Sequence, residues 1–564
     1  MADFGPDPRG ATDAEHDGHV LIVGAGPTGL CLALALRRLG VDCTVIDAGE
    51  GPRVEPRAAV VWPREAELLA AIGLGDRLRA AALPLGATAV FRGRRRLGLL
   101  PSEGVASAFP RPLVIEQHVL QRLLEAELFD AGLQVQWRTH LVDFAAQDDG
   151  VVARLIRDDG SGGPFRASWL VGCDGARSLV RKRLGVPFLG RAVPDLEVVQ
   201  VKANLDWPYD PALGALFLAG GRAMGAFPMP DGRRRFYCFK TIDEPARTSA
   251  PRLEEMQALI SGMMGGAPVR LRDVDWLSRA RFQERVAQRL RVGRALLAGD
   301  AAHVWPAVGG HGMAVAILGA CNLGWRLAAV IRGQGPEALL DAYDHEQRAQ
   351  ARTMIGKMRM DLLERPLPAP AVMGLAALLP AVLGLAPVRR WIERGLLSDL
   401  GLHHRSSPCS ASRAPGRLRA GDRLPDTLAL VGGQARRLHD LIAFGNWTLL
   451  VGPNVDIDLI TPRLAGRAPV RIVQIGSATA PHGASILLLV RPDGYVGLTA
   501  RLDDPGALDA YLDAWLPVTA AYSREARVSW PVMNSSKAGV PASVSAMPRL
   551  MAGMMSSGRV TRSP

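Results

Sequence analysis

The glycine-rich hexapeptide Gly24-Ala25-Gly26-Pro27-Thr28-Gly29 is the segment with the clearest chemical meaning. It follows HVLIV, an apolar run typical of a buried parallel strand, and it opens a stretch that predicts a helix. In such a turn Gly24 permits a tight bend, Gly26 lets backbone N–H groups approach a pyrophosphate, and Gly29 lets helix and strand pack closely. Asp47 ends the next expected strand, 18 residues after Gly29, where a carboxylate can accept ribose hydrogen bonds. The pattern predicts a dinucleotide-binding βαβ unit.

Two further motifs follow expected strands later in the chain. Gly172-Cys173-Asp174-Gly175-Ala176-Arg177-Ser178 comes after the apolar run SWLV, and Gly299-Asp300-Ala301-Ala302-His303 comes after ALLA. The first turn alone suits FAD and NAD(P) equally, because both carry a pyrophosphate. The two later motifs decide between them.

Together the three motifs resemble the signatures of the single-component flavoprotein aromatic hydroxylases, the p-hydroxybenzoate hydroxylase and phenol hydroxylase class. Pro56-Arg57-Ala58 and Gln117 are similar to further parts of the family's FAD domain. The segment Leu489–Val496 (LVRPDGYV) is the clearest match to the thioredoxin-like third domain of the phenol hydroxylase subgroup. The resemblance extends from about residue 18 to 520, but within 194–285 almost nothing matches the family.

The resemblance implies a set of cofactor-binding residues. Asp300 would accept a hydrogen bond from the ribityl chain, Asp174 and Arg177 would link FAD and NAD(P)H binding, and Arg57 would hold the diphosphate or the moving flavin. The helix starting near Gly312 would direct its positive end at the flavin N1–C2=O side. The full expected set is Gly24, Gly26, Gly29, Asp47, Arg57, Gln117, Asp174, Arg177, Gly299, Asp300, Pro306, Gly309, Gly310, Gly312 and Met313.

His311 is the candidate catalytic side chain, in a reaction otherwise carried by the flavin without a metal or a covalent nucleophile. It stands where Gln or Lys is commoner in the family, and Ala314 stands where Asn is common. Two interpretations remain open: a polar loop residue that points to solvent, and a proton-handling residue near the flavin ring. His303 is expected to be structural.

Other polar groups are interpreted as surface features. His403 and His404 are adjacent and lack ligand partners in the sequence, so we expect them in a surface loop. The short runs Arg94–Arg96 and Arg233–Arg235 are expected in solvated turns. Trp62, Trp305 and Tyr237 could line a substrate pocket or pack in the core.

The elements around the motifs alternate between strand and helix patterns. From about 194 to 285 they give way to short strand patterns separated by turns. We expect an α/β protein: a Rossmann-type FAD-binding domain, an inserted, mostly antiparallel β-sheet substrate domain and a C-terminal thioredoxin-like α/β domain. The expected boundaries are 1–17 for a disordered tail, 18–193 with 286–365 for the FAD-binding domain, 194–285 (with part of 83–112) for the substrate domain, 366–415 for a helical connector and linker, 416–522 for the thioredoxin-like domain without redox cysteines, and 523–564 for a disordered tail.

Composition excludes several classes of protein. With 48% hydrophobic and 22% charged residues among 564, the chain is neither disordered nor a disulfide scaffold. The net charge of +12 would suit nucleic-acid binding, but only five of the 67 basic residues are Lys and the arginines are spread along the chain. We therefore expect no nucleic-acid partner.

Cysteine usage and the absence of a signal peptide indicate a cytoplasmic protein. The six cysteines form no CxxC pair or metal-ligand spacing, so buried free thiols and no metal site are expected. The uncharged stretch 366–387 is interrupted by Pro370 and Pro380, and we interpret it as helices docked on the protein, with a membrane-surface or partner contact as the alternative. Oligomeric state, including a homodimer, stays open.

The resemblance implies an FAD-dependent monooxygenase that uses NADPH or NADH and O₂ to hydroxylate a small aromatic, phenolic substrate through a C4a-hydroperoxyflavin. One alternative is a monooxygenase of the same fold that performs Baeyer–Villiger oxidation, epoxidation or antibiotic modification. An alternative of another class is a non-catalytic FAD-binding partner or regulator.

Overall fold

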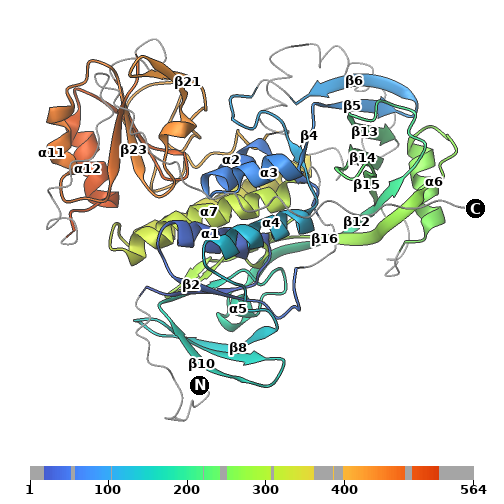
Figure 1. Ribbon diagram of the computed structural model, residues 1–564, viewed down its shortest axis with the longest axis horizontal. Coiled ribbons are helices and arrows are strands. Elements are labelled where there is room, and N and C mark those ends of the chain that lie inside the picture. The colour runs from blue at the N-terminus through green and yellow to red at the C-terminus, as the bar shows by residue number, and fades with distance from the viewer. Residues whose placement is uncertain are drawn as a thin grey trace, which may run out of the picture.

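The glycine-rich turn lies at the end of a strand in a five-stranded sheet of the computed structural model (Figure 1). β1 (Val20–Val23) runs parallel to both neighbours, β2 (Cys43–Ile46) and β11 (Trp169–Gly172). β18 (Ala295–Leu297) extends the parallel set beyond β11, and β17 (Arg291–Val292) closes that edge in the antiparallel direction. The carboxyl ends of β1, β11 and β18 meet at one edge, and one of the three motifs follows each of them.

Some expectations fall outside the described part of the chain. The structure describes residues 18–52, 58–102, 105–219, 222–241, 251–306, 310–360, 385, 398–476 and 486–519. The expected tails at 1–17 and 523–564, most of the connector and nearly all of 366–387 lie outside these ranges. Arg57 and Gly309 lie outside them too, and their roles stay predictions.

Helices pack around the sheet. α1 (Pro27–Arg38) begins with Pro27, whose missing N–H would have no partner in the first helical turn anyway. Leu30 to Leu36 are completely buried, because α1 packs against β2, α4 (Gln117–Asp130) and α7 (His311–Ile331). The other helices around this part are α2 (Pro63–Ala71), α3 (Gly75–Ala81), α5 (Leu179–Arg183) and α8 (Ala338–Met360).

α7 is a core helix. Among the described residues it alone is long and apolar enough to cross a membrane, but 83% of its most apolar window is buried inside the protein. It lies in the middle of the molecule, with the C-terminal sheet on one side and the largest sheet on the other (Figure 1). Its burial by protein accounts for its apolar composition.

The largest sheet has eight strands and confirms the expected antiparallel insertion. Neighbouring strands are antiparallel except β13 and β5, which pair in parallel. α6 (Leu253–Met263) packs against β12, β13 and β14. In spatial order the strands are β19 (His303–Val304), β16 (Arg272–Ala287), β12 (Phe188–Asn204), β15 (Arg234–Thr241), β14 (Arg222–Pro228), β13 (Gly214–Ala219), β5 (Ala87–Arg92) and β6 (Arg95–Pro101).

Two small sheets flank these elements. One is antiparallel and consists of β8 (Thr139–Ala146), β9 (Val151–Arg157) and β10 (Gly162–Ala167). The other joins β3 (Val60–Val61), β7 (Leu113–Val114) and β4 (Leu83–Pro84).

The expected solvated turn at Arg233–Arg235 is wrong for two of its three residues. Arg234 and Arg235 are buried because they lie on β15 rather than in the turn before it. Arg234 lies over the ring of Trp207, and Arg235 lies 4.0 Å from the ring centre of Trp276. Flat guanidinium groups stack well on aromatic faces, which offsets part of the cost of burying them.

The C-terminal part folds around a mixed five-stranded sheet, as expected. Its order is β20 (Ala411–Ser412), β26 (Val496–Arg501), β25 (Ile486–Val490), β23 (Trp447–Val451) and β24 (Val470–Gln474). The hairpin β21 (Leu428–Val431) and β22 (Gln434–Arg437) and the helices α11 (Thr461–Leu464) and α12 (Pro505–Trp515) complete it. All six cysteines of the chain are buried free thiols.

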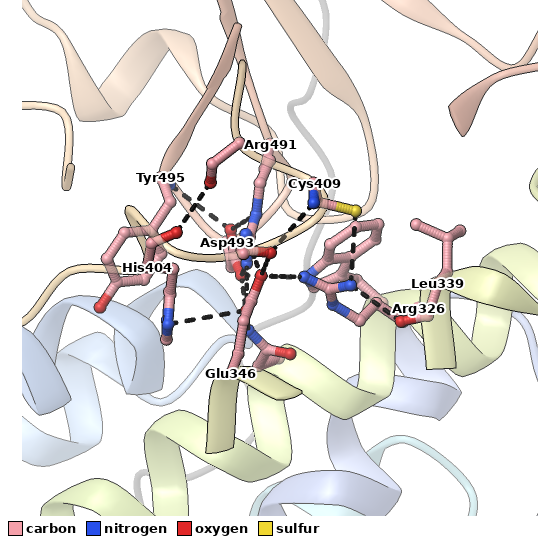
Figure 2. A network of polar contacts seen from close by, with 12 residues as sticks. Arg326, Leu339, Glu346, His404, Cys409, Arg491, Asp493 and Tyr495 are labelled. Atoms are coloured by element: carbon pink, nitrogen blue, oxygen red, sulfur yellow. Dashed lines mark hydrogen bonds and ion pairs between the residues drawn. The ribbon is translucent and has the colours of Figure 1, made fainter. Parts of the chain in front are cut away.

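A buried network of ion pairs attaches the C-terminal sheet to α7 and α8 (Figure 2). Glu346 of α8 lies 2.7 Å from Arg326 of α7 and 2.7 Å from Arg491, in the turn between β25 and β26. Asp493 pairs with Arg491 and accepts a hydrogen bond from the indole of Trp325 at 3.1 Å. Two arginines thus face two carboxylates with almost no exposure to water, so the charges balance only when the sheet is docked.

The expectation that His403 and His404 share a surface loop is wrong for His404. His404 is buried against Glu346, with 3.7 Å between Nδ1 and a carboxylate oxygen, whereas His403 is exposed. Burial lowers the pKa of His404 to about 4 despite the neighbouring carboxylate. Burial alone would raise the pKa of Glu346, but Arg326 and Arg491 hold it well below its usual range.

We predict that His404 makes the folded protein sensitive to mild acid. An unfolded histidine takes up its proton near pH 6.5, so between pH 6.5 and about 4 the unfolded chain binds one more proton at this site. Stability should then fall with falling pH by about 1.4 kcal/mol per pH unit. Between pH 7 and pH 5 the melting temperature of the wild type should fall further than that of His404→Gln. An equal fall in the two proteins would contradict this.

Candidate functional site

The glycine-rich turn is built on two very close backbone approaches. Gly24 has φ +109°, and a β-carbon there would lie 2.4 Å from the carbonyl oxygen of Cys173. A β-carbon on Gly29 would lie 2.0 Å from the carbonyl oxygen of Gly24. A β-carbon on Gly26, by contrast, would meet no atom within 4 Å. Two glycines are therefore needed for packing, and Gly26 faces open space.

Asp47 supports the same turn. One carboxylate oxygen accepts a hydrogen bond from the backbone N–H of Ala25, and the other accepts one from Gly49, each at 2.8 Å. The residue is half-buried at the end of β2. It therefore holds the turn while part of the side chain stays accessible to a ligand.

The second motif places Asp174 at the start of α5. One of its carboxylate oxygens accepts hydrogen bonds from the N–H groups of Leu179 and Val180, at 2.6 and 3.1 Å. The other carboxylate oxygen is buried without a hydrogen-bond partner in the described structure. Arg177 is exposed. A buried acceptor without a partner is costly and indicates a site that a donor from a ligand can complete.

The third motif packs against the first. Gly299, with φ +60°, lies so close to Thr28 that a β-carbon would be 2.4 Å from the threonine hydroxyl. The N–H of Ala298 donates to the carbonyl of Gly172 at 3.0 Å, which joins the second and third motifs. Asp300 is exposed at this edge of the sheet. The three motifs, which lie far apart in the sequence, therefore converge.

Two residues that the sequence analysis missed hold this arrangement. The guanidinium of Arg181 donates to the carbonyls of Ala301 and Ala176, each at 2.9 Å, and so ties the second motif to the third. Gln121 donates to the carbonyl of Ala25 at 2.9 Å. Gln121 could have been found from the sequence, because it lies one helical turn after Gln117 on the same face of α4.

Gln117 lies at the first position of α4, beside the segment that follows Arg57. Its backbone N–H donates to the carbonyl of Ala58 at 3.0 Å, and its side-chain oxygen accepts from the N–H of Ala58 at 3.3 Å. The side chain thus fixes the start of the described chain after residue 57. Its expected contact with FAD stays a prediction.

The expected flavin loop, Pro306–Met313, enters α7 at its N-terminus. Pro306 is buried, Gly310 has φ +75°, and Gly312 and Met313 are half-buried in the first helical turn. No β-carbon contact would occur at Gly312 within 4 Å. The first turn of α7, whose N-cap Gly310 makes no side-chain cap hydrogen bond, therefore presents a position without a side chain.

His311 does not point to solvent, so that interpretation is wrong. Its ring is buried, stacks on Trp62 with 4.8 Å between centroids, and lies 2.9 Å from a carboxylate oxygen of Asp399. Trp62 in turn donates from its indole N–H to the carbonyl of Gly310 at 3.3 Å. A proton-handling role for His311 stays a prediction.

His303 and Trp305 pack against each other before this loop. Their rings lie 5.0 Å apart and nearly parallel, and both are buried. Burial lowers the pKa of His303 to about 4, so the imidazole is neutral at neutral pH. These observations support the expected structural role of His303.

An apolar cluster lies between the large sheet and the strand that leads to Trp62. Its buried members are Ala59, Leu85, Val114 and Met229, with Phe227 and Tyr237 packed against them. The rings of Phe227 and Tyr237 meet edge to face, with centroids 6.4 Å apart. Two aromatic side chains of the large sheet thus face the segment that reaches the flavin loop.

The residues at this edge fit a flavin dinucleotide. Open space at Gly26 leaves room for a pyrophosphate, the half-buried Asp47 can accept from a ribose, and the unpartnered oxygen of Asp174 needs a donor. The N-terminus of α7 adds a helix dipole beside the expected loop.

Comparisons with known proteins agree with this geometry. A family model described as an FAD binding domain matches residues 17–357, and one described as the C-terminal part of aromatic-ring hydroxylases matches 418–517. The chain is 30% identical to a 6-methylpretetramide 4-monooxygenase from Streptomyces rimosus, over 93% of this chain and 99% of the relative.

Two further proteins illustrate the similarity. The chain is 33% identical to a 12-dehydrotetracycline 5-monooxygenase/anhydrotetracycline 6-monooxygenase from Streptomyces rimosus subsp. rimosus, over 85% of this chain and 95% of that protein. The crystal structure of a ternary complex of aklavinone-11 hydroxylase with FAD and aklavinone matches with a TM-score of 0.71 and 26% identity. That match covers 89% of this chain and 99% of the other.

We predict opposite defects from two alanine substitutions in one turn. Gly26→Ala adds a methyl group in open space, so the protein should fold normally but bind FAD at least about tenfold more weakly. Gly29→Ala forces a backbone clash and should lower the melting temperature of the apoprotein as well. Titration of apoprotein with FAD, together with thermal unfolding without FAD, separates the two effects. Wild-type FAD affinity in Gly26→Ala would contradict the pyrophosphate position.

Proposed function

Because this chain belongs to the FAD-binding family of aromatic-ring hydroxylases, we propose that it hydroxylates a phenolic, polycyclic aromatic substrate with NAD(P)H and O₂. The chain is an FAD-dependent monooxygenase. The observation that carries the proposal is that the three motifs meet at one sheet edge, where the backbone of Gly24 lies against the carbonyl of Cys173. The names of the relatives, which give 6-methylpretetramide, 12-dehydrotetracycline, anhydrotetracycline and aklavinone as substrates, support the polycyclic substrate class.

We assign the cofactor contacts as follows. The backbone around Gly24, Gly26 and Gly29 would hold the pyrophosphate, Asp47 the ribose and Asp300 the ribityl chain. The remaining expected contacts are proposed for Arg57, Gln117, Asp174, Arg177, Gly299, Pro306, Gly309, Gly310, Gly312 and Met313. Bound FAD would supply the redox chemistry by taking a hydride from NAD(P)H and activating O₂.

The chain's own contribution is to hold the substrate and exclude water. Tyr237 and Phe227 on the large sheet offer aromatic surface to a planar ring. A phenol held as its anion is electron-rich, which lowers the barrier to electrophilic attack. Excluding water protects the reactive oxygen donor until it meets the ring.

Location is proposed from the state of the cysteines. Six buried free thiols support a reducing compartment, and we propose the cytoplasm. A homodimer is a further proposal.

Product analysis tests the proposed reaction. The purified protein should be yellow, and with NADPH and ¹⁸O₂ it should add one ¹⁸O atom to a member of a panel of phenols and aromatic polyketides. A product that carries oxygen inserted into a ring, or an epoxide, would favour the same-fold alternative. NADPH oxidation without any oxygenated product across the panel would contradict the proposal.

We predict that Asp300→Ala weakens FAD binding without unfolding the chain. Losing a hydrogen bond to a charged acceptor costs roughly 1.5–3 kcal/mol, or about ten- to a hundredfold in affinity. Asp341→Ala is the matched control, since Asp341 is also exposed and pairs with Arg291 on the outside of α8. Equal FAD affinity in the two variants would contradict the ribityl contact.

A further inference from the structure

Asp399 is a buried carboxylate at an unusual place. It lies in the short segment that leads to the C-terminal sheet, 88 positions from His311, and its side chain is 2% exposed. Its backbone has φ +54°, in the left-handed region that non-glycine residues rarely adopt. A strained backbone that buries a charged group requires a compensating interaction.

That interaction is the contact with His311. Nδ1 of His311 lies 2.9 Å from one oxygen of Asp399 and 3.0 Å from the other, and the imidazole side chain is also 2% exposed. Because an ionised carboxylate can only accept hydrogen bonds, Nδ1 must carry a proton. The pair therefore fixes both the tautomer and the orientation of the ring.

The ring of His311 continues the contact into the flavin loop. It stacks on Trp62 at an interplanar angle of 18°, and the indole N–H of Trp62 donates to the carbonyl of Gly310. The backbone N–H of Trp62 is held in turn by a carboxylate oxygen of Glu65 at 3.2 Å. Gly310 of the loop and His311, the first residue of α7, thus depend on one assembly.

A second contact joins the Asp399 segment to this assembly. The backbone N–H of Arg64 donates to the carbonyl of Ser398 at 3.2 Å, so the segment is tied to the first turn of α2. Glu65 lies in the same turn, and burial raises its pKa well above the usual range. The segment that carries Asp399 is therefore held against α2 as well as against His311.

We propose that Asp399 is a positioning residue for the flavin, which acts through His311 and Trp62 to hold the first turn of α7 and the end of the flavin loop in place. The segment leading to the C-terminal sheet would thereby influence FAD affinity and the flavin reduction potential. This inference rests on the proposed function, since it requires FAD beside Gly310 and Gly312.

The physical basis is the short range of the helix-end field. The positive end of α7 acts within about one helical turn, so a small displacement of that turn weakens its interaction with a bound group. An anionic reduced flavin would gain more from this field than an oxidised one. Loosening the turn should therefore weaken FAD binding and lower the reduction potential together.

The test compares Asp399→Asn with a buried control. Asn tolerates the left-handed backbone and keeps the shape, so this substitution removes the charge and replaces one acceptor oxygen with an NH₂ donor. Asp426→Asn is the control, because Asp426 is also buried in the C-terminal part, where it accepts from Arg437 and the N–H of His439, and within the described residues it makes no hydrogen bond to His311, Trp62 or α7. For each variant we would measure the FAD dissociation constant, the visible flavin spectrum, the midpoint potential and the melting temperature.

We expect about tenfold weaker FAD binding, a changed flavin spectrum and a more negative midpoint potential in Asp399→Asn. Asp426→Asn should lose thermal stability and keep the wild-type flavin properties. His311→Gln should reproduce the Asp399→Asn effect, and the double variant should be no worse than either single variant, since both substitutions act on the same contact. His311→Gln also serves as the test if Asp399→Asn yields no folded protein.

Three results would overturn the proposal. Wild-type affinity and potential in both variants of the pair would show that the contact is only structural. A more positive potential would show that the carboxylate acts directly through its charge. Flavin changes of the same size in Asp426→Asn would show a general effect of destabilisation. A wild-type protein that binds no FAD would instead contradict the proposed function itself.

Discussion

The close approach of Gly24 to the carbonyl of Cys173 is the constraint on which the rest of the site depends. Even one additional carbon atom at Gly24 would come within 2.4 Å of that oxygen. This approach brings the first and second motifs to one edge, and the parallel pairing of β11 with β18 adds the third. The protein thus assembles its site from three distant segments through backbone packing, with side chains such as Arg181 and Gln121 added to hold the turns.

Much of this arrangement could be predicted from the sequence, because its signals are local. The apolar run before Gly24, the spacing to Asp47 and the order of the motifs all depend on neighbouring residues, and the structure confirms the predicted fold class. The mostly antiparallel insertion could be predicted because short strand patterns separated by turns replace the alternating strands and helices. Its exact strand order could not be predicted.

The missed features depend on partners far away in the sequence. His404 looked like a surface residue because nothing near it explains its burial, and Glu346 lies 58 positions earlier. Arg235 looked like part of a charged turn, but its aromatic partner Trp276 is on another strand. His311 and Asp399 are separated by 88 positions. A sequence pattern within one element does not reveal such pairs. The contact that stabilises the buried residue forms only when both elements are packed together.

The parallel pairing of β13 with β5 has a consequence for how this protein can be altered. β5 and β6 precede α4 and lie between the first and second motifs in the chain, whereas β12 to β16 follow α5 and the second motif. The large sheet therefore combines strands from two separate parts of the sequence. Its strands cannot be exchanged with those of a relative by a single crossover. A chimaera that changes seven of the eight strands of this sheet, all but β19, must recombine the gene in two separate windows, around residues 87–101 and 188–287. Libraries built from one contiguous block would combine mismatched sheet halves.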